Sequence, residues 1–502
     1  MKKINRHIIF ILVLLVCNSP SICQLVVSPG SSITIKDGTS LYVGTDLYLK
    51  SDAIGSGHLA DQNAIGNCTI SGYKTVERYL TNTGWHNVSS PVNNANSSIF
   101  TGTDLIFYYD ESIILNDWNF GWVWYDGSLI VMKGYDIFLP STITSYYTAT
   151  NVETLNTGIY TTGITRTDVS NGEAENRKGW NLIGNPYPSP VDWLMESGWD
   201  KSYINDAKYI WDPDNNNYTI FIGGSSPTGI NGGTQYIPSN QGFWVQAIQN
   251  GITTINNTSR IGIMTATPDY YKDLNSTNQE LRLIACGNGF TDETMIRFVK
   301  GTTPEVDINN DATKLFSTHD SVPQLYTIAE NMPMAINSHS EIIDGLAIDM
   351  DFQCKTTGKY NISIDEGSTI DKLQYIYLKD LREEKMICLS SEKVYHFYHH
   401  TSYINSRFVV YFNPSEETIK NLNPQSYFNI VTYKNTLTIT RNTSEDYNGE
   451  VRIYNMFGQS LTSYPLSDNI KTTINVNLPV GYYIASIVAD NLIINSKIWI
   501  TH

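Results

Sequence analysis

Tryptophans beside acidic hairpins are the side chains of this sequence best suited to recognising a ligand. Trp118, Trp122 and Trp124 share one segment, and Trp211 lies in a second segment further along the chain. An indole ring on a rigid β-loop can stack on a sugar or anchor a protein, because it joins a large apolar face to an N–H donor. The same rings often fill β-protein cores, so both interpretations stay open. We predict these four tryptophans as candidate ligand-binding residues.

Two loops rich in Asp and Asn could hold a cation. Their oxygen-bearing side chains alternate along the chain, which suits Ca²⁺ because it takes about six to eight oxygen ligands. Neither loop has the glycine and the later glutamate of a complete EF-hand loop, and an Asx turn explains the same composition. We favour Asx turns and keep calcium as an optional cofactor, with none required. The candidate ligands are Asp212, Asp214 and Asn216 in one loop and Asp307, Asn309 and Asp311 in the other.

Patterns that would indicate catalysis are absent from the sequence. Adjacent carboxylates such as Asp110–Glu111 and Asp292–Glu293 serve a glycosidase only where the fold sets each opposite a partner. His396 and His400 could share a helix face and bind a metal, but the aromatic residues between them favour a strand. No H-E-x-x-H, G-x-S-x-G or C-x-x-C motif occurs. We therefore predict no catalytic residues and favour a non-enzymatic adhesin or binding protein; the alternative is an extracellular hydrolase acting on polysaccharide or protein.

The charge and composition indicate an extracellular β-protein. The sequence has 33 Lys and Arg against 49 Asp and Glu, a net charge of −16, and only 16% of its residues are charged. A strongly acidic chain argues against nucleic acid as a partner, since phosphates are bound by Lys and Arg. The 33 tyrosines and 35 glycines, with many Asn, Thr and Ser, are typical of strands and turns.

The N-terminal segment has the composition of a signal peptide. Basic residues precede the apolar run of residues 8–17, which is too short to span a bilayer core about 30 Å thick. Small residues follow, so we expect residues 1–23 to be removed and the mature chain to start at Gln24. Four widely spaced cysteines remain, and we expect them to be unpaired, buried small side chains. They are Cys68, Cys286, Cys354 and Cys388.

Alternating apolar and polar residues, broken by Gly, Pro and Asn turns, divide the mature chain into β-units. The short strands at its start fit a β-solenoid or a β-meander, and the last segment has the strand number of an Ig-like sandwich. We predict an all-β, multidomain fold with units at residues 24–75 (short strands), 76–264 (two related β-lobes), 281–413 (a β-sandwich) and 430–502 (an Ig-like domain).

The second unit contains an internal duplication. Its copies, at about 84–140 and 179–248, share a Gly-Trp start, a Pro-Val turn, an acidic aromatic hairpin and a Gly-aromatic strand. Two copies are too few for a solenoid array, so we expect two related lobes packed together. In the third unit, residues 311–314 favour one helical turn.

Four elements lie in order at the C-terminus: VRIYNMFGQ, INVNLP, GYYI and a lysine. The strand VRIYNMFGQ fits a hydrophobic-x-hydrophobic-(Y/F)-(N/D)-x-x-G pattern, LPVGYYI fits L-x-x-G-x-Y-(I/V), and a lysine follows close to the end. Residues 430–502 thereby resemble the C-terminal sorting domain of type IX secretion cargo in Gram-negative bacteria. Stretches such as GWNLIGNPYPSPVDW are similar to segments of large cargo proteins of that system. The matching sorting residues are Tyr454, Asn455, Gly458, Leu478, Gly481, Tyr483 and Lys497.

This resemblance implies a route and not an activity. Such cargo crosses the inner membrane, is recognised at the outer membrane through its C-terminal domain, and is released or anchored at the cell surface. Proteases, glycosidases and adhesins carry the same domain, so it identifies no ligand. The expected partners are the type IX secretion machinery and a glycan or a host or matrix protein, with an extracellular or cell-surface location.

Overall fold

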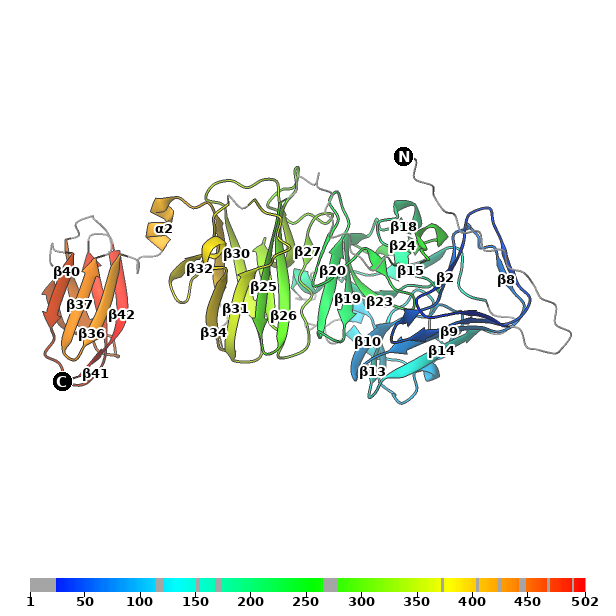
Figure 1. Cartoon of the computed structure of the whole chain (residues 1–502), viewed down its shortest axis with the longest axis horizontal. Coiled ribbons are helices and arrows are strands. Elements are labelled where there is room, and N and C mark those ends of the chain that lie inside the picture. The colour runs from blue at the N-terminus through cyan, green and yellow to red at the C-terminus, as the bar shows by residue number, and fades with distance from the viewer. Residues whose placement is uncertain are drawn as a thin grey trace, which may run out of the picture.

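The computed structural model is all-β and contains several separate sheets (Figure 1). It describes residues 24–113, 121–149, 154–167, 174–262, 264, 279–371, 374–402, 406–422, 427–441, 448–466, 470–489 and 492–501. The predicted signal peptide, residues 1–23, lies outside this part. The described α-helices are short, α1 (Leu389–Glu392) and α2 (Glu416–Leu422). Within the described residues, no helix is long and apolar enough to cross a membrane.

The N-terminal unit is a short β-solenoid, one of the two forms predicted for it. Its strands are β1 (Leu25–Val27), β2 (Ser32–Ile35), β3 (Leu41–Val43), β4 (Leu47–Leu49), β5 (Ser51–Asp52), β6 (Gly55–Ser56), β7 (His58–Asp61), β8 (Cys68–Ile70) and β9 (Lys74–Leu80). Parallel pairs β1–β4–β9, β2–β7 and β3–β8 form successive sides of the coil, and β5 and β6 form a small hairpin. Strand β14 (Ile143–Ala149) then pairs antiparallel with β9. The coil encloses buried Leu47, Leu49 and Val76.

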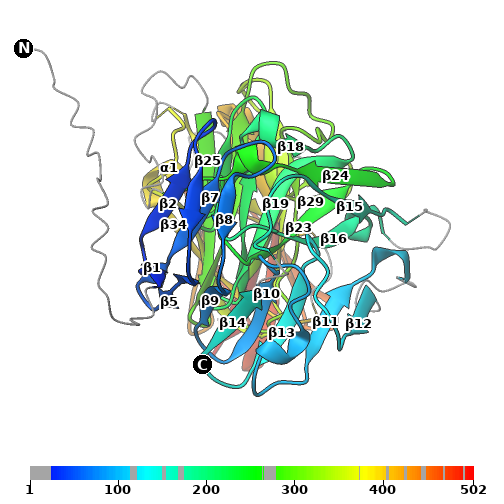
Figure 2. The same ribbon diagram turned by 90° about the vertical axis from the view of Figure 1, so that its right-hand side faces the viewer.

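The duplicated segments form two lobes with matching sheets. The first lobe consists of β10 (Gly84–Val88), β11 (Ile106–Tyr109), β12 (Trp122–Trp124) and β13 (Tyr135–Leu139), and the second of β16 (Trp180–Gly184), β19 (Ile204–Asp212), β20 (Asn217–Ile222), β21 (Thr228–Ile230) and β23 (Gly242–Ala247). The strand orders, β10-β13-β11-β12 and β16-β23-β19-β20-β21, correspond strand for strand until the added β21. The register corresponds too, since Val88 lies opposite Tyr135 as Ile183 lies opposite Phe243. Figure 2 shows the first-lobe sheet below the strands of the second lobe.

The two lobes contact each other reciprocally. An isolated bridge joins Val88 to Gln241, and its counterpart joins Ile183 to Lys133. The glycine after each partner allows this approach, because a Cβ on Gly242 would lie 2.9 Å from the Val88 carbonyl oxygen and one on Gly134 would lie 2.7 Å from that of Ile183. The lobes therefore pack through equivalent surfaces.

Short strands cover the other face of the second lobe. They are β15 (Tyr160–Ile164), β17 (Val191–Asp192), β18 (Trp199–Asp200), β22 (Tyr236–Ile237) and β24 (Gly251–Ile255), in one three-stranded and one two-stranded sheet. Trp193 and Trp199 of this region meet with ring centroids 5.0 Å apart, in a core that also contains Phe243. These two tryptophans are therefore structural.

The third unit is one large sheet that wraps around a single core. Its strands are β25 (Gln279–Gly287), β26 (Phe290–Phe298), β27 (Ala312–Thr313), β28 (Gln324–Ala329), β29 (Met332–His339), β30 (Ala347–Gln353), β31 (Gly358–Ile364), β32 (Ile376–Asp380), β33 (Lys385–Cys388), β34 (Val394–His399) and β35 (Phe408–Phe412). The eleven-stranded sheet runs from β33 to β34, and helix α1 connects these two outermost strands directly. The helical turn expected near residues 311–314 was wrong, because β27 pairs with β29.

The C-terminal unit is a seven-stranded sandwich at one end of the molecule (Figure 1). One sheet has β36 (Phe428–Tyr433), β37 (Thr436–Arg441) and β40 (Lys471–Asn475); the other has β38 (Gly449–Tyr454), β39 (Ser460–Pro465), β41 (Gly481–Ala489) and β42 (Leu492–Ile500). Leu437, Val451 and Ile487, all fully buried, belong to the core between the sheets. The predicted Ig-like strand number is confirmed.

Candidate functional site

One face of the first-lobe sheet is open where its counterpart in the second lobe is covered. In the second lobe that face shares a buried core with Met295, Leu315 and Ile336 of the third unit. In the first lobe Trp85 is 36% exposed, and Phe107 and Trp122 are half-buried. Successive side chains of a strand point to opposite sides, so the register gives the residues that share this face. They are Trp85, Asn87, Phe107, Tyr109, Trp122, Trp124, Asp136 and Phe138.

An aromatic cavity of about 310 Å³ lies on this open face. Trp122 meets Trp244 edge-to-face at 5.5 Å between ring centroids and Tyr109 at 5.2 Å. Trp85 lies 5.9 Å from Phe107, and its carbonyl oxygen accepts a 3.0 Å hydrogen bond from Trp211 Nε1. These contacts hold the rings in place, as a ligand pocket requires. The cavity is lined by Trp85, Asn87, Phe107, Trp122, Asp136, Trp211, Tyr218, Trp244 and Thr318.

A polar pair stands among these rings. Asn87 Nδ2 donates to Asp136 Oδ1 at 2.8 Å, and Trp244 Nε1 donates to Asn87 Oδ1 at 3.2 Å. The indole N–H therefore orients the amide so that its NH₂ group faces the carboxylate. Burial raises the pKa of Asp136 well above its ordinary value, and the hydrogen bond from Asn87 opposes that rise only in part. The Asp136 side chain is half-buried and forms part of the cavity wall.

The four predicted tryptophans do not all lie at the cavity. Trp122 and Trp211 line the cavity. Trp124 shares the open face but is not part of the cavity wall; it is 58% exposed, and its Nε1 donates to the Asp104 carbonyl at 3.0 Å. Trp118 lies outside the described residues.

Sequence reasoning missed several cavity residues. Trp85 stands in the repeated Gly-Trp start, and Asn87 and Asp136 belong to no known motif. An alignment of the two copies carries a signal for the polar pair. At the equivalent cross-strand positions the second lobe has Leu182 opposite Trp244, where the first lobe has Asn87 opposite Asp136.

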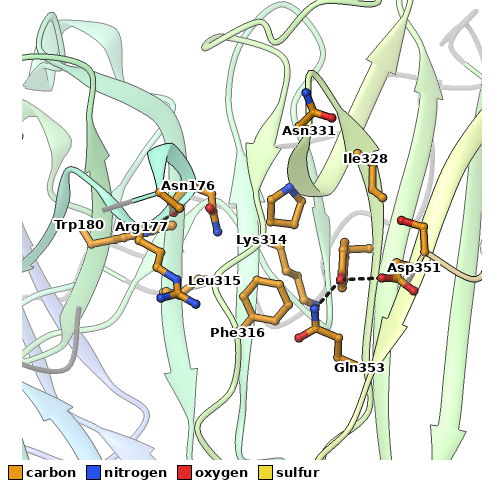
Figure 3. A pocket seen from close by; sticks show the side chains of 14 residues that line it. Asn176, Arg177, Trp180, Lys314, Leu315, Phe316, Ile328, Asn331, Asp351 and Gln353 are labelled. Carbon is orange, nitrogen blue, oxygen red and sulfur yellow. Dashed lines mark hydrogen bonds between the residues drawn. The ribbon is translucent and has the colours of Figure 1, made fainter. Parts of the chain in front are cut away.

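A second cavity, of about 420 Å³, lies between the turn at Arg177 and strands β28 and β30 (Figure 3). The Tyr326 hydroxyl donates to Asp351 Oδ2 at 3.1 Å and accepts from Gln353 Nε2 at 2.6 Å. Lys314 lines the wall, but its Nζ lies 2.5 Å from the buried Asp292 carboxylate. Four of its polar side chains, those of Lys314, Tyr326, Asp351 and Gln353, are thus engaged with one another or with the core, so it is the weaker candidate.

The two acidic loops have the geometry of Asx turns. Asp212 Oδ1 accepts from the Asp214 backbone N–H at 2.9 Å, and Asp307 Oδ1 accepts from that of Asn309 at 2.8 Å. Asp311 accepts backbone N–H groups of Asp307 and Ser338, while burial raises its pKa to about 6. Among the described residues, no group of three or more His, Cys, Asp or Glu could hold a metal ion. Calcium at Asp212, Asp214, Asn216, Asp307, Asn309 and Asp311 stays a prediction.

The adjacent carboxylates serve as acceptors within the fold. Glu111, 1% exposed, accepts from the backbone N–H groups of Thr167 and Gly179 at 2.7 and 2.8 Å. Glu293 Oε1 lies 2.8 Å from Arg282 Nη1. In the described part of the chain, each of the two cavities is lined by a single carboxylate.

The predicted strand at the histidine cluster is confirmed. His396 lies on β34 of the large sheet, and His400 follows its last residue. Neighbouring His399 is buried and its Nε2 lies 2.9 Å from the Cys354 carbonyl oxygen. The four cysteines, Cys68, Cys286, Cys354 and Cys388, are unpaired as expected, but only Cys354 is buried and the other three are half-buried.

The first predicted sorting element forms the end of a strand and a tight turn. Tyr454 ends β38, and Asn455 Oδ1 accepts from the backbone N–H groups of Phe457 and Gln459 at 3.0 Å each. Gly458 has φ +81°, a conformation that favours glycine. The motif therefore encodes the connection between β38 and β39.

The second and third elements anchor strand β41, and the lysine stays on the surface. Gly481 begins β41, and Leu478 packs against the sandwich core. The Tyr483 ring is buried, and its hydroxyl donates to the Pro479 carbonyl at 2.8 Å, as in a tyrosine corner. Lys497 is exposed, with its Nζ 4.4 Å from the centre of the Tyr482 ring.

Comparison with known protein families gives one match. A family model described as a domain of unknown function (DUF8693) matches residues 14–412. The match ends at the last residue of β35, so it includes the solenoid, both lobes and the large sheet but not the C-terminal sandwich. No curated protein matches the chain.

Proposed function

The chain belongs to the DUF8693 family, and we propose that this member is an exported, non-enzymatic binding protein that holds its ligand in the aromatic cavity of the first lobe. It acts at the cell surface or after release from it. The ligand is a glycan or a group on a host or matrix protein, presented to the open face.

The observation that carries this proposal is the difference between the equivalent faces of the two lobes. The second-lobe face packs largely against the large sheet, whereas the first-lobe face exposes aromatic rings around a polar pair. Aromatic rings with a few converging polar groups are the usual composition of a ligand pocket. A face kept only for stability would be expected to carry apolar residues and a cover.

For export, the support is the resemblance of residues 430–502 to a type IX sorting domain. These residues form a sandwich of their own beyond the family match, in keeping with a separable sorting module. Exposed Lys497 and the turn at Tyr454–Gly458 lie on its surface, where a secretion component could reach them. The partner on this route is the type IX machinery.

No observation favours the hydrolase alternative. Glycoside hydrolysis generally uses two carboxyl groups on either side of the scissile bond. Asp136 in one described cavity and Asp351 in the other each stand without a second carboxyl group in the wall.

The binding proposal is tested with the full mature chain on a glycan array and on immobilised matrix proteins. We expect retention on at least one of these surfaces, and a loss of at least tenfold in the Trp122→Ala variant. The matched control is Trp124→Ala, which removes the same side chain outside the cavity and should retain binding within twofold. Equal retention by all three proteins would exclude the cavity as the site.

The export proposal has a separate test in the native host. Deletion of residues 430–502 should leave the protein in the periplasm, whereas the full chain reaches the surface or the medium. Surface display of the truncated protein would refute export through this domain.

A further inference from the structure

In the described part of the chain, the Asp136 carboxylate has one hydrogen-bond donor and no ion-pair partner. Among the residues that the structure describes, Asn87 is the only group that donates a hydrogen bond to it, through Oδ1. The ion pairs between described residues do not include Asp136, and the described residues of the cavity wall contain no Lys, Arg or His. A half-buried carboxylate among aromatic rings, with no cationic side chain beside it, favours either a proton or a bound cation.

The fold does not require a carboxylate at this position. The equivalent pair of the second lobe, Leu182 and Trp244, is 3% and 1% exposed and gives the same sheet with the same register. An acidic residue that costs stability and is replaced by an apolar one in the sister lobe points to a ligand that supplies the missing charge.

The walls around the carboxylate also suit a cation. Trp85, Phe107 and Trp122 come from three strands and line the cavity together with Trp244. The π faces of such rings attract an ammonium or guanidinium group, and tryptophan does so most strongly. The chain as a whole is acidic, with a net charge of −16, which raises the local concentration of cations.

We propose that the cavity binds a protonated primary amine carried on a compact carbon skeleton, with the ammonium group against Asp136 and the skeleton between the indole rings. An N–H-bearing cation fits better than a quaternary one, because the carboxylate can accept further hydrogen bonds. This inference rests on the proposed function and specifies its ligand. Amino sugars, lysine side chains and small diamines all carry this group.

The test is isothermal titration calorimetry with the full mature chain and matched probes. Glucosamine is compared with N-acetylglucosamine, which keeps the ring but loses the charge. Nα-acetyl-lysine amide and cadaverine then distinguish a protein source from a free amine. We expect glucosamine to bind at least tenfold more tightly than N-acetylglucosamine, and the tightest of the three amines to identify the source.

Two variants make the result specific to the carboxylate. Asp136→Asn keeps the side-chain shape and an acceptor for Asn87, and should reduce the preference for the charged probe to less than threefold. Trp124→Ala should leave that preference unchanged. Melting curves verify that both variants are folded.

Each outcome separates the inference from the proposal on which it rests. Equal affinity for glucosamine and N-acetylglucosamine, with loss of both in Trp122→Ala, overturns the cation and retains the binding cavity. An unchanged preference in Asp136→Asn also overturns the inference. If no probe binds, the amine is excluded, and the array experiment with Trp122→Ala alone decides whether the cavity is a binding site.

Discussion

The two lobes share a strand order and a register but differ in what lies on one face. Strand β10 places Asn87 opposite Asp136 of β13, and strand β16 places Leu182 opposite Trp244 of β23. Leu182 and Trp244 belong to the core shared with the large sheet, whereas Asn87 and Asp136 line a cavity of about 310 Å³ in whose wall Trp244 also lies. The face of the second copy is therefore mostly part of the core, whereas the face of the first copy is partly open.

This difference teaches which residues serve folding and which serve recognition. Burial of a carboxyl or amide group without full partners costs free energy, so a lobe selected for stability alone would resemble the second one. The polar pair of the first lobe is tolerated because Asn87 bonds both Trp244 and Asp136, and because Asp136 is only half-buried. Substitutions at three places test this difference: Leu182 in the core of the second lobe, the glycines at the contact between the lobes, and Asp136.

The largest effect is expected from Leu182→Asn, which gives the second lobe the amide of the first. Leu182 is 3% exposed in an apolar core, so the new amide would lose its hydration and leave a packing defect. We expect the free energy of unfolding to fall by about 3 kcal/mol, measured by urea denaturation followed by tryptophan fluorescence. Ile252→Asn, at a 52% exposed position of β24, is the control and should change it by only about 0.5 kcal/mol. Similar losses in both variants would contradict the difference between the faces.

A smaller effect is expected at the reciprocal contact between the lobes. Alanine at Gly134 or Gly242 would bring Cβ to 2.7 or 2.9 Å from a backbone carbonyl oxygen of the other lobe. Each substitution should lower the free energy of unfolding by about 2 kcal/mol, because neither backbone can move without separating the lobes.

The control for this pair is Gly163→Ala on β15, where an added Cβ meets no atom within 4 Å. It should be neutral or slightly stabilising, since alanine restricts the unfolded chain. The lobes would not pack as equivalent surfaces if one of the two contact variants were as stable as the wild type.

The smallest effect on stability is expected from Asp136→Asn, and it has the opposite sign. Burial raises the pKa of Asp136, so the folded state holds its proton more tightly than the unfolded chain does. Ionisation at pH 7 therefore costs stability, and the variant should gain about 1 kcal/mol at that pH. As the pH falls through the raised pKa towards 4, the wild type regains stability and the gain should disappear.

Denaturation curves at pH 7 and pH 4 measure this effect. A carboxylate kept for the fold would instead make the variant less stable at pH 7. The combination of higher stability with loss of the amine preference would identify Asp136 as a residue that serves binding.

The fold class and the main units of the chain could be predicted from the sequence. Alternating side chains and turn residues predicted the all-β class, the strand number of the C-terminal sandwich and the duplication. The helical turn near residues 311–314 was wrong, because Ala312 pairs with Ile336 on a distant strand and this tertiary contact overrides the local preference.

Only part of the candidate site could be predicted from the sequence. Trp122 and Trp211 were chosen for their type and hairpin context, yet Trp124 in the same strand as Trp122 lies outside the cavity wall. Exposure of a ring depends on which face the third unit covers, and no local pattern contains that information. Asp136 is recognised as a candidate binding residue only from its position beside Asn87 and Trp244, and both lie far from it in the sequence.

The central claim is that the aromatic cavity on the open face of the first lobe holds the ligand. The most direct measurement is ¹⁹F NMR of the full mature chain labelled with 5-fluorotryptophan, with each resonance assigned by substitution, during titration with glucosamine. We predict that the resonances of Trp85, Trp122, Trp211 and Trp244 shift, whereas those of buried Trp193 and distant Trp499 do not. Saturable binding that leaves these four cavity resonances unmoved would contradict the account.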